Sequence, residues 1–153
     1  MSARNTSCPL QRLMTSQIRG FNECAKPPPP FLKVRRLPHE QWVQLDENYA
    51  ISNRGRWYSI RKSLILAQSA NSSGYLRATT CVDGIIKHRL THIKVIEIFG
   101  DCNGNRLPHG AESLRAYRLS IDHRDRNKHN NHQNNLEIVT HQENCLRKFI
   151  KKP

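Results

Sequence analysis

The order of apolar and polar positions in residues 119–150 predicts a strand, a loop, a second strand and a helix. Apolar and polar residues alternate over residues 119–121, as in a half-buried strand, and a short β-branched run follows at residues 136–139. The residues between these runs are too polar to form a core. Thr140 and Glu143 have the spacing of a capping box, and apolar residues then recur at helical spacing.

Upstream, the pattern predicts two hairpins and a short helix. Trp42 and residues 49–51, then a turn at Ser52-Asn53-Arg54-Gly55 and an apolar run at residues 57–60, predict a compact hairpin. A second hairpin is predicted over residues 75–90, across the turn dipeptide Asp83-Gly84. Residues 93–99 then predict a helix ended by Gly100, and residues 101–115, rich in Gly, Asn and Pro, predict a surface loop. The fold class that follows is α+β.

Three polar residues in the predicted strand–loop–strand–helix segment suggest chemistry. Asp122 and His123 lie where the first strand should end, and Asn144 lies in the first turns of the helix. A neutral imidazole can take a proton from water near neutral pH. A carboxylate and an amide oxygen are hard donors that suit a magnesium ion keeping several waters. Such a group could cut a phosphodiester, although an isolated Asp-His pair is usually an ordinary surface turn.

This stretch resembles the HNH motif of the ββα-metal endonucleases, especially phage and intron homing enzymes. The resemblance rests on Asp122-His123, Asn130-Asn131, Asn135-Leu136 and the segment Val139 to Asn144. It implies that His123 is the general base, that Asp122 and Asn144 bind Mg²⁺ (or Mn²⁺), and that Asn135 is the central Asn that braces the loop at the catalytic site. The third letter of the motif is Asn144 rather than His. A departure is Arg126, where homing members often carry Gly, so the loop turn is expected to differ.

A second resemblance involves residues upstream of the motif. The series Tyr49-x-Ile51-Ser52-Asn53-x-Gly55-Arg56, preceded by Trp42, is similar to a nuclease-associated DNA-binding module found before many phage HNH domains. The aromatic residues also read simply as hairpin core. The family's His-Arg-Leu helix start corresponds either to His88-Arg89-Leu90 or to His92, and the sequence leaves both open.

The predicted organisation has three parts. Residues 1–37 form a basic, Pro-rich arm, residues 38–66 the upstream module, and residues 67–153 the HNH domain, with the ββα-metal motif at 117–150. The composition of residues 1–22 resembles a mitochondrial transit peptide, and the alternative is an arm that adds DNA affinity. The expected location is the cytoplasm of a phage-infected bacterium or a host cell, with the mitochondrion as the alternative.

A formal net charge of +13 favours a polyanionic partner, and double-stranded DNA is the expected one. The basic residues predicted to contact nucleic acid are Arg54, Arg56, Arg61, Lys62, Arg77, Lys87, Arg89, Arg124 and Lys128. No apolar run approaches the length of a membrane span.

Five widely spaced cysteines without a C-x-x-C pair argue against a disulfide framework and against a zinc knuckle. Cys102 and His109, joined by a distant cysteine, are the alternative by which zinc could be held.

Two functions remain at this point. The first is a metal-dependent homing-type endonuclease that hydrolyses DNA phosphodiester bonds. The second is a noncatalytic nucleic-acid-binding protein derived from the same fold, such as a component of an organellar ribosome or other ribonucleoprotein.

Overall fold

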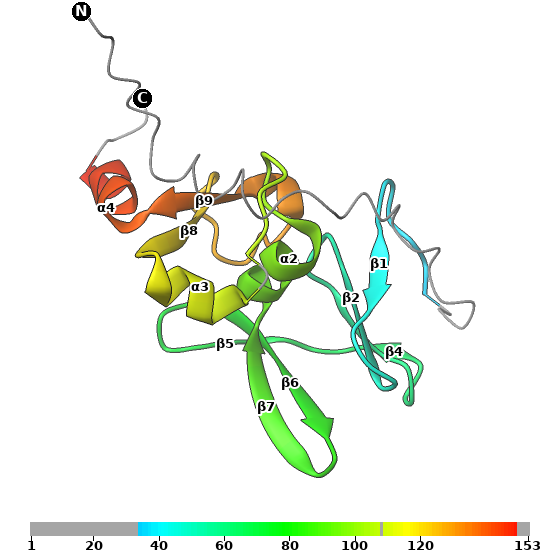
Figure 1. Cartoon of the computed structure of the whole chain (residues 1–153). Helices are drawn as coiled ribbons and strands as arrows, with labels where there is room; N and C mark the ends of the chain where they lie inside the picture. Colours follow the sequence, from blue (N-terminus) through cyan, green and yellow to red (C-terminus); the bar gives the residue numbers. More distant parts are fainter. Residues whose placement is uncertain (1–33, 108, 150–153) are drawn as a thin grey trace, which may run out of the picture.

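The computed structural model describes residues 34–107 and 109–149, and Figure 1 shows how their elements are arranged. The predictions for the N-terminal segment, up to residue 33, lie outside the described residues. Within the described part the strands form three separate antiparallel sheets, combined with helices. The predicted α+β fold class is confirmed.

The first sheet contains the upstream hairpin and has the strand order β1-β2-β3-β4. The strands are β1 (Trp42–Gln44), β2 (Tyr49–Ser52), β3 (Trp57–Ser59) and β4 (Leu64–Ile65). Ile51 pairs with Trp57, so the predicted hairpin across the turn at Ser52–Gly55 is present. Trp42, Ala50 and Tyr58 are buried together on this sheet, and Val34 packs against them. Residue 34, assigned to the arm from the sequence, therefore contacts the sheet.

The second sheet has the order β5-β6-β7, with strands β5 (Ser69–Ala70), β6 (Leu76–Val82) and β7 (Ile85–Leu90). The predicted hairpin is confirmed, because Val82 pairs with Ile85 across Asp83 and Gly84. Both turn residues have positive φ, 53° and 75°, as a type I′ turn requires. In Figure 1 the end of this hairpin projects away from the rest of the fold.

Two helices follow, α2 (Thr91–Phe99) and α3 (Gly110–Ala116). Helix α2 ends before Gly100, whose φ is 86°, as predicted. The prediction of a surface loop over residues 101–115 was wrong for its second half, which is α3. The Gly, Asn and Pro residues of the first half dominated the composition and hid the helix-favouring residues 111–116.

The first half of this segment is not a simple surface loop either. The carboxylate of Asp101 is buried and accepts hydrogen bonds from the backbone N–H groups of Asn103, Asn105 and Ile138. The contact with Ile138 attaches the segment to the last sheet.

The third sheet and the last helix form the strand–loop–strand–helix unit that the sequence predicted. It consists of β8 (Leu119–His123), a 3₁₀ turn η1 (Gln133–Asn135), β9 (Leu136–Thr140) and α4 (His141–Phe149). Asp122 pairs with Glu137, and His123 pairs with Leu136. Thr140 caps α4, because its Oγ1 accepts a hydrogen bond from the backbone N–H of Glu143 at 3.1 Å.

One hydrophobic core joins the three sheets. Ile51 and Trp57 of the first sheet are buried with Ala78 of the second sheet and with Ile121 and Leu136 of the third. The indole Nε1 of Trp57 also donates to Oγ1 of Thr91 at 3.1 Å. The core therefore crosses the predicted boundary between residues 66 and 67. Among the described helices, none is long and apolar enough to span a bilayer.

Candidate active site

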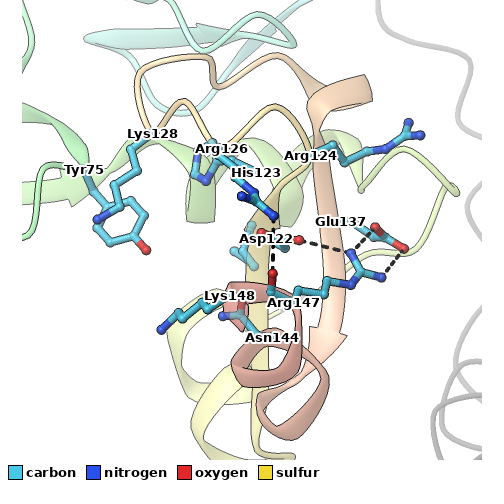
Figure 2. A pocket seen from close by; sticks show the side chains of 11 residues that line it. Tyr75, Asp122, His123, Arg124, Arg126, Lys128, Glu137, Asn144, Arg147 and Lys148 are labelled. Atoms are coloured by element: carbon cyan, nitrogen blue, oxygen red, sulfur yellow. Dashed lines mark hydrogen bonds and ion pairs between the residues drawn. The ribbon is translucent and has the colours of Figure 1, made fainter. Parts of the chain in front are cut away.

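A cavity of about 530 Å³ lies between the end of β8, the loop that follows it and helix α4. Figure 2 shows the side chains around it. The lining residues are Tyr75, Ile121, Asp122, His123, Arg124, Arg126, Lys128, Glu137, Asn144, Arg147 and Lys148. Five of these side chains are cationic and two are carboxylates, so the cavity suits an anion.

His123 is fixed by a buried amide. It is the last residue of β8 and only 5 % exposed, and its Nε2 lies 3.1 Å from Oδ1 of Asn131. The amide nitrogen of Asn131 donates to the carbonyl of His129, which leaves Oδ1 as the acceptor for the imidazole. Because Oδ1 can only accept, Nε2 carries the proton and Nδ1 carries the lone pair. This is the tautomer of a neutral general base.

The surroundings of His123 favour the neutral imidazole. Burial lowers its pKa, although the hydrogen bond to Asn131 and the charges of Asp125 and Asp122 act in the opposite direction. The lowered pKa keeps the lone pair available at neutral pH.

Two more rings pack beside His123. The His92 ring lies 5.5 Å from the His123 ring, and the Tyr75 ring lies 4.7 Å from His92 and 5.9 Å from His123, measured between centroids. Burial, together with the nearby His123, lowers the pKa of His92 to about 3. His88, the other histidine that the resemblance left open, is exposed on β7 and bonds to Thr79. It is therefore His92 that lies beside His123.

Asp122 shares a cation with two other carboxylates. Nη1 of Arg147, on α4, lies 3.0 Å from Oδ2 of Asp122 and 2.7 Å from Oε2 of Glu137, while Nη2 lies 2.6 Å from Oε1 of Glu143. Figure 2 shows the guanidinium group between Asp122 and Glu137. The hydrogen bond to Arg147 lowers the pKa of Glu137. The ion pair with Arg147 therefore favours the ionised form of Glu137.

Asn144 lines the same cavity from α4, and Asp122 lines it from β8. One carboxylate and one amide oxygen fit a hard divalent cation that retains most of its waters. Arg147 engages Oδ2 of Asp122, and a carboxylate has a second oxygen to offer. No cluster of three His, Cys, Asp or Glu residues suited to a metal is found within residues 34–107 and 109–149.

Asn135 lies in the loop between the strands rather than in the cavity lining. Its Oδ1 accepts from the backbone N–H of Asp125 at 3.1 Å. Its Nδ2 donates to Oδ1 of Asp125 and to the carbonyl of Asn130, both at 2.8 Å. These bonds close the loop on itself. Arg126, in the same loop, has a φ of 62°, the left-handed conformation that glycine adopts most easily. The backbone there keeps a conformation typical of glycine despite the arginine.

The predicted nucleic-acid-binding residues divide into two groups. Arg124 and Lys128 line the cavity. The others lie on the first two sheets and their turns, outside the lining: Arg54, Arg56, Arg61, Lys62, Arg77, Lys87 and Arg89. Arg56 is engaged elsewhere, since its guanidinium forms an ion pair with Glu40 and stacks over Trp42.

Sequence reasoning assigned no role to several residues of this site. Asn131 was part of the quoted motif, but nothing local indicated that it would bond to His123. Arg147 could have been suspected from its spacing of four residues after Glu143, which is typical of an ion pair on a helix. Tyr75 and His92 are distant in sequence from the motif, and only the fold brings them to it.

No protein-family profile and no curated protein matched the chain. Among solved structures, the chain is similar to a chain of the structure that describes DNA binding and cleavage by the HNH homing endonuclease I-HmuI. The two share 25% sequence identity with a TM-score of 0.56, over 73% of this chain and 62% of the other. The chain thus spans less than two thirds of that enzyme. With the sheets and helices described above, this similarity shows that the chain has an HNH nuclease-like α+β fold.

Proposed function

We propose that this chain is a metal-dependent endonuclease of the HNH type, which hydrolyses phosphodiester bonds of double-stranded DNA. The observation that carries the proposal is the position of His123. Its imidazole is neutral, has its tautomer set by Asn131, and lines one cavity with Asp122, Asn144 and five cationic side chains. The similarity to I-HmuI, a homing enzyme whose structure concerns DNA binding and cleavage, supports the same function.

Each residue has a role in this proposal. Nδ1 of His123 takes a proton from the attacking water. Asp122 and Asn144 would hold Mg²⁺ or Mn²⁺, which when bound neutralises the charge that develops on the scissile phosphate. The cationic side chains Arg124 and Lys128 hold the phosphates on either side.

Arg147 has a defined part as well. With the acids free of metal, its guanidinium pairs with Asp122, Glu137 and Glu143 at once. Glu137 and Glu143 can retain the guanidinium when Asp122 turns to another cation. Arg147 therefore stays paired when Asp122 binds another cation. An unpaired arginine in a partly buried site would cost free energy.

The direct test is nicking of a supercoiled plasmid by the full chain in Mg²⁺, with EDTA as the control. We expect nicking that requires the divalent cation. Binding should weaken with salt, with a slope near −0.9 in log K against log salt for each phosphate contacted.

A noncatalytic nucleic-acid-binding protein is the second candidate, and the Arg147 network favours it. Asp122 already has a cationic partner at 3.0 Å, so this carboxylate is paired without a metal. Salt-sensitive DNA or RNA binding without any nicking in Mg²⁺ or Mn²⁺ would support this candidate over the nuclease.

A further inference from the structure

The turn between β2 and β3 presses against the loop that carries Asn131. Gly55 in this turn has a φ of 77°. A Cβ atom added there would lie 2.7 Å from Cβ of Asn131, 3.0 Å from Cγ2 of Thr91 and 3.3 Å from the carbonyl oxygen of Asn131. A methyl group does not fit at 2.7 Å, so the glycine is needed both for its φ and for the close approach.

Hydrogen bonds attach the turn to the loop and to the core. The carbonyl of Asn53 accepts from the backbone N–H of Gln133 at 2.8 Å, two residues after Asn131. The carbonyl of Gly55 accepts from Nε2 of Gln68 at 2.8 Å, and Gln68 in turn bonds to Oγ1 of Thr91. The turn therefore contacts the loop at two points and is itself held from behind.

Asn131 transmits this contact to His123. It is only 2 % exposed, and its Oδ1 is the partner of Nε2 of His123. A shift of the Asn131 backbone away from Gly55 would move this acceptor relative to the imidazole.

The arginines of the turn are engaged within the protein. Nη2 of Arg54 donates to the carbonyl of Pro38 at 2.6 Å, and the guanidinium of Arg56 is paired with Glu40. The backbone of the turn faces the loop with His123. Through these contacts, the motif Ser52-Asn53-x-Gly55-Arg56 packs the turn against the rest of the fold.

We propose that the Ser52–Gly55 turn is a positioning element for His123, acting through Asn131. The turn holds Asn131 in place, and Asn131 keeps the proton of His123 on Nε2, so that the lone pair stays on Nδ1. This inference rests on the proposed function, and it adds a long-range determinant of the geometry of the base.

Gly55→Ala tests the proposal, with Gly104→Ala as the matched control. Gly104 has a φ of 80°, but a Cβ added there meets nothing within 4 Å. Both variants place a side chain at a similar positive φ, and only Gly55→Ala also presses on Asn131 and Thr91. We expect Gly55→Ala to lower kcat by about 10²-fold, the effect that a misplacement of about 1 Å can have, with KM for DNA unchanged. Gly104→Ala should keep the parent kcat.

A second readout needs neither metal nor DNA. The imidazole ¹⁵N chemical shifts report which nitrogen carries the proton, and a His123→Ala spectrum assigns the signal. At one fixed pH we expect His123 of the parent protein and of Gly104→Ala to be protonated on Nε2. In Gly55→Ala, and in Asn131→Ala, we expect a mixture of tautomers.

Asn131→Ala removes the Oδ1 acceptor of His123 and leaves the turn intact. This variant therefore tests the proposal even if Gly55→Ala does not fold. Parent-like tautomer and kcat in a folded Gly55→Ala would overturn the proposal, as would an unchanged tautomer in Asn131→Ala. The two proposals can also be separated. If the parent protein does not nick DNA, but the Nε2–H tautomer is present in the parent and lost in both Gly55→Ala and Asn131→Ala, the proposed nuclease is contradicted and the positioning role is supported.

Discussion

His123 has two contrasting surroundings, one buried and one open. On the buried side its ring meets Asn131 and His92, both at most 6 % exposed. On the open side lies the cavity, where partly exposed charged groups such as Arg147 and Asp122 bond to one another. The buried side fixes one geometry and one protonation state, while the open side can exchange partners. An active site needs both, because a base must be rigid and a substrate must enter.

The comparison predicts different consequences on each side. Changes on the buried side should alter the tautomer, the rate and the stability. Changes on the open side should alter the binding of metal and nucleic acid while the fold remains.

The largest effect should come from His123 itself, where the two sides meet. His123→Ala should lower cleavage by roughly 10²- to 10⁴-fold, the contribution of a positioned acid–base group, and leave DNA affinity nearly unchanged. His88→Ala, on the exposed face of β7, is the control and should cleave like the parent. Plasmid nicking and a binding titration measure the two quantities. Unimpaired nicking by His123→Ala would exclude His123 as the base.

Asn144 tests the open side. Asn144→Ala should impair cleavage in limiting Mg²⁺, because it removes an amide oxygen from the cavity. Asn144→His should retain cleavage and shift its preference toward Mn²⁺ or Ni²⁺, since imidazole suits softer metals. The helix should persist in both, because Thr140 caps it independently. Cleavage across a metal series and circular dichroism measure this, and a parent-like Asn144→Ala would remove Asn144 as a ligand.

His92 tests the buried side through pH. Its pKa is lowered to about 3 in the folded protein, whereas an unfolded histidine has its ordinary value of 6.5. Between these values the unfolded chain binds more protons, so the stability that the neutral His92 contributes above pH 6.5 is lost as pH falls toward 3. The slope is at most about 1.4 kcal/mol per pH unit for one such group.

The free energy of unfolding of His92→Phe should therefore fall less steeply than that of the parent as pH drops below 6.5. The difference between the two proteins should be smaller at neutral pH than in acid. Urea unfolding at several pH values measures the free energy of unfolding. Parallel curves for the variant and the parent would show that His92 does not take up a proton on unfolding.

The smallest effect is expected for Arg147. Arg147→Met leaves Asp122, Glu137 and Glu143 without their shared cation, and should lower the free energy of unfolding by about 1 kcal/mol, since each partly exposed pair contributes little. Adding Mn²⁺ should raise the melting temperature of Arg147→Met by more than it raises that of Lys148→Met, the neighbouring control. Equal responses to Mn²⁺ would indicate that Arg147 and the metal do not share Asp122.

The unit β8, β9 and α4 was readable from the sequence because its determinants are local. Alternation in residues 119–121 and the spacing of Thr140 and Glu143 specify strand and helix without help from the rest of the chain. The Asp83-Gly84 turn is local in the same sense, because two residues set its backbone conformation. Helix α3 was missed because turn-forming residues precede it directly.

The sequence by itself therefore determined the elements of the HNH-like unit and the types of side chain available for its chemistry. Only the tertiary structure decided which groups meet. It selected His92 over His88, placed Gly55 against Asn131, and joined Arg147 to three carboxylates. The physical reason is that local patterns set backbone conformation, whereas partners far apart in sequence are chosen by core packing and by the need to satisfy buried polar groups.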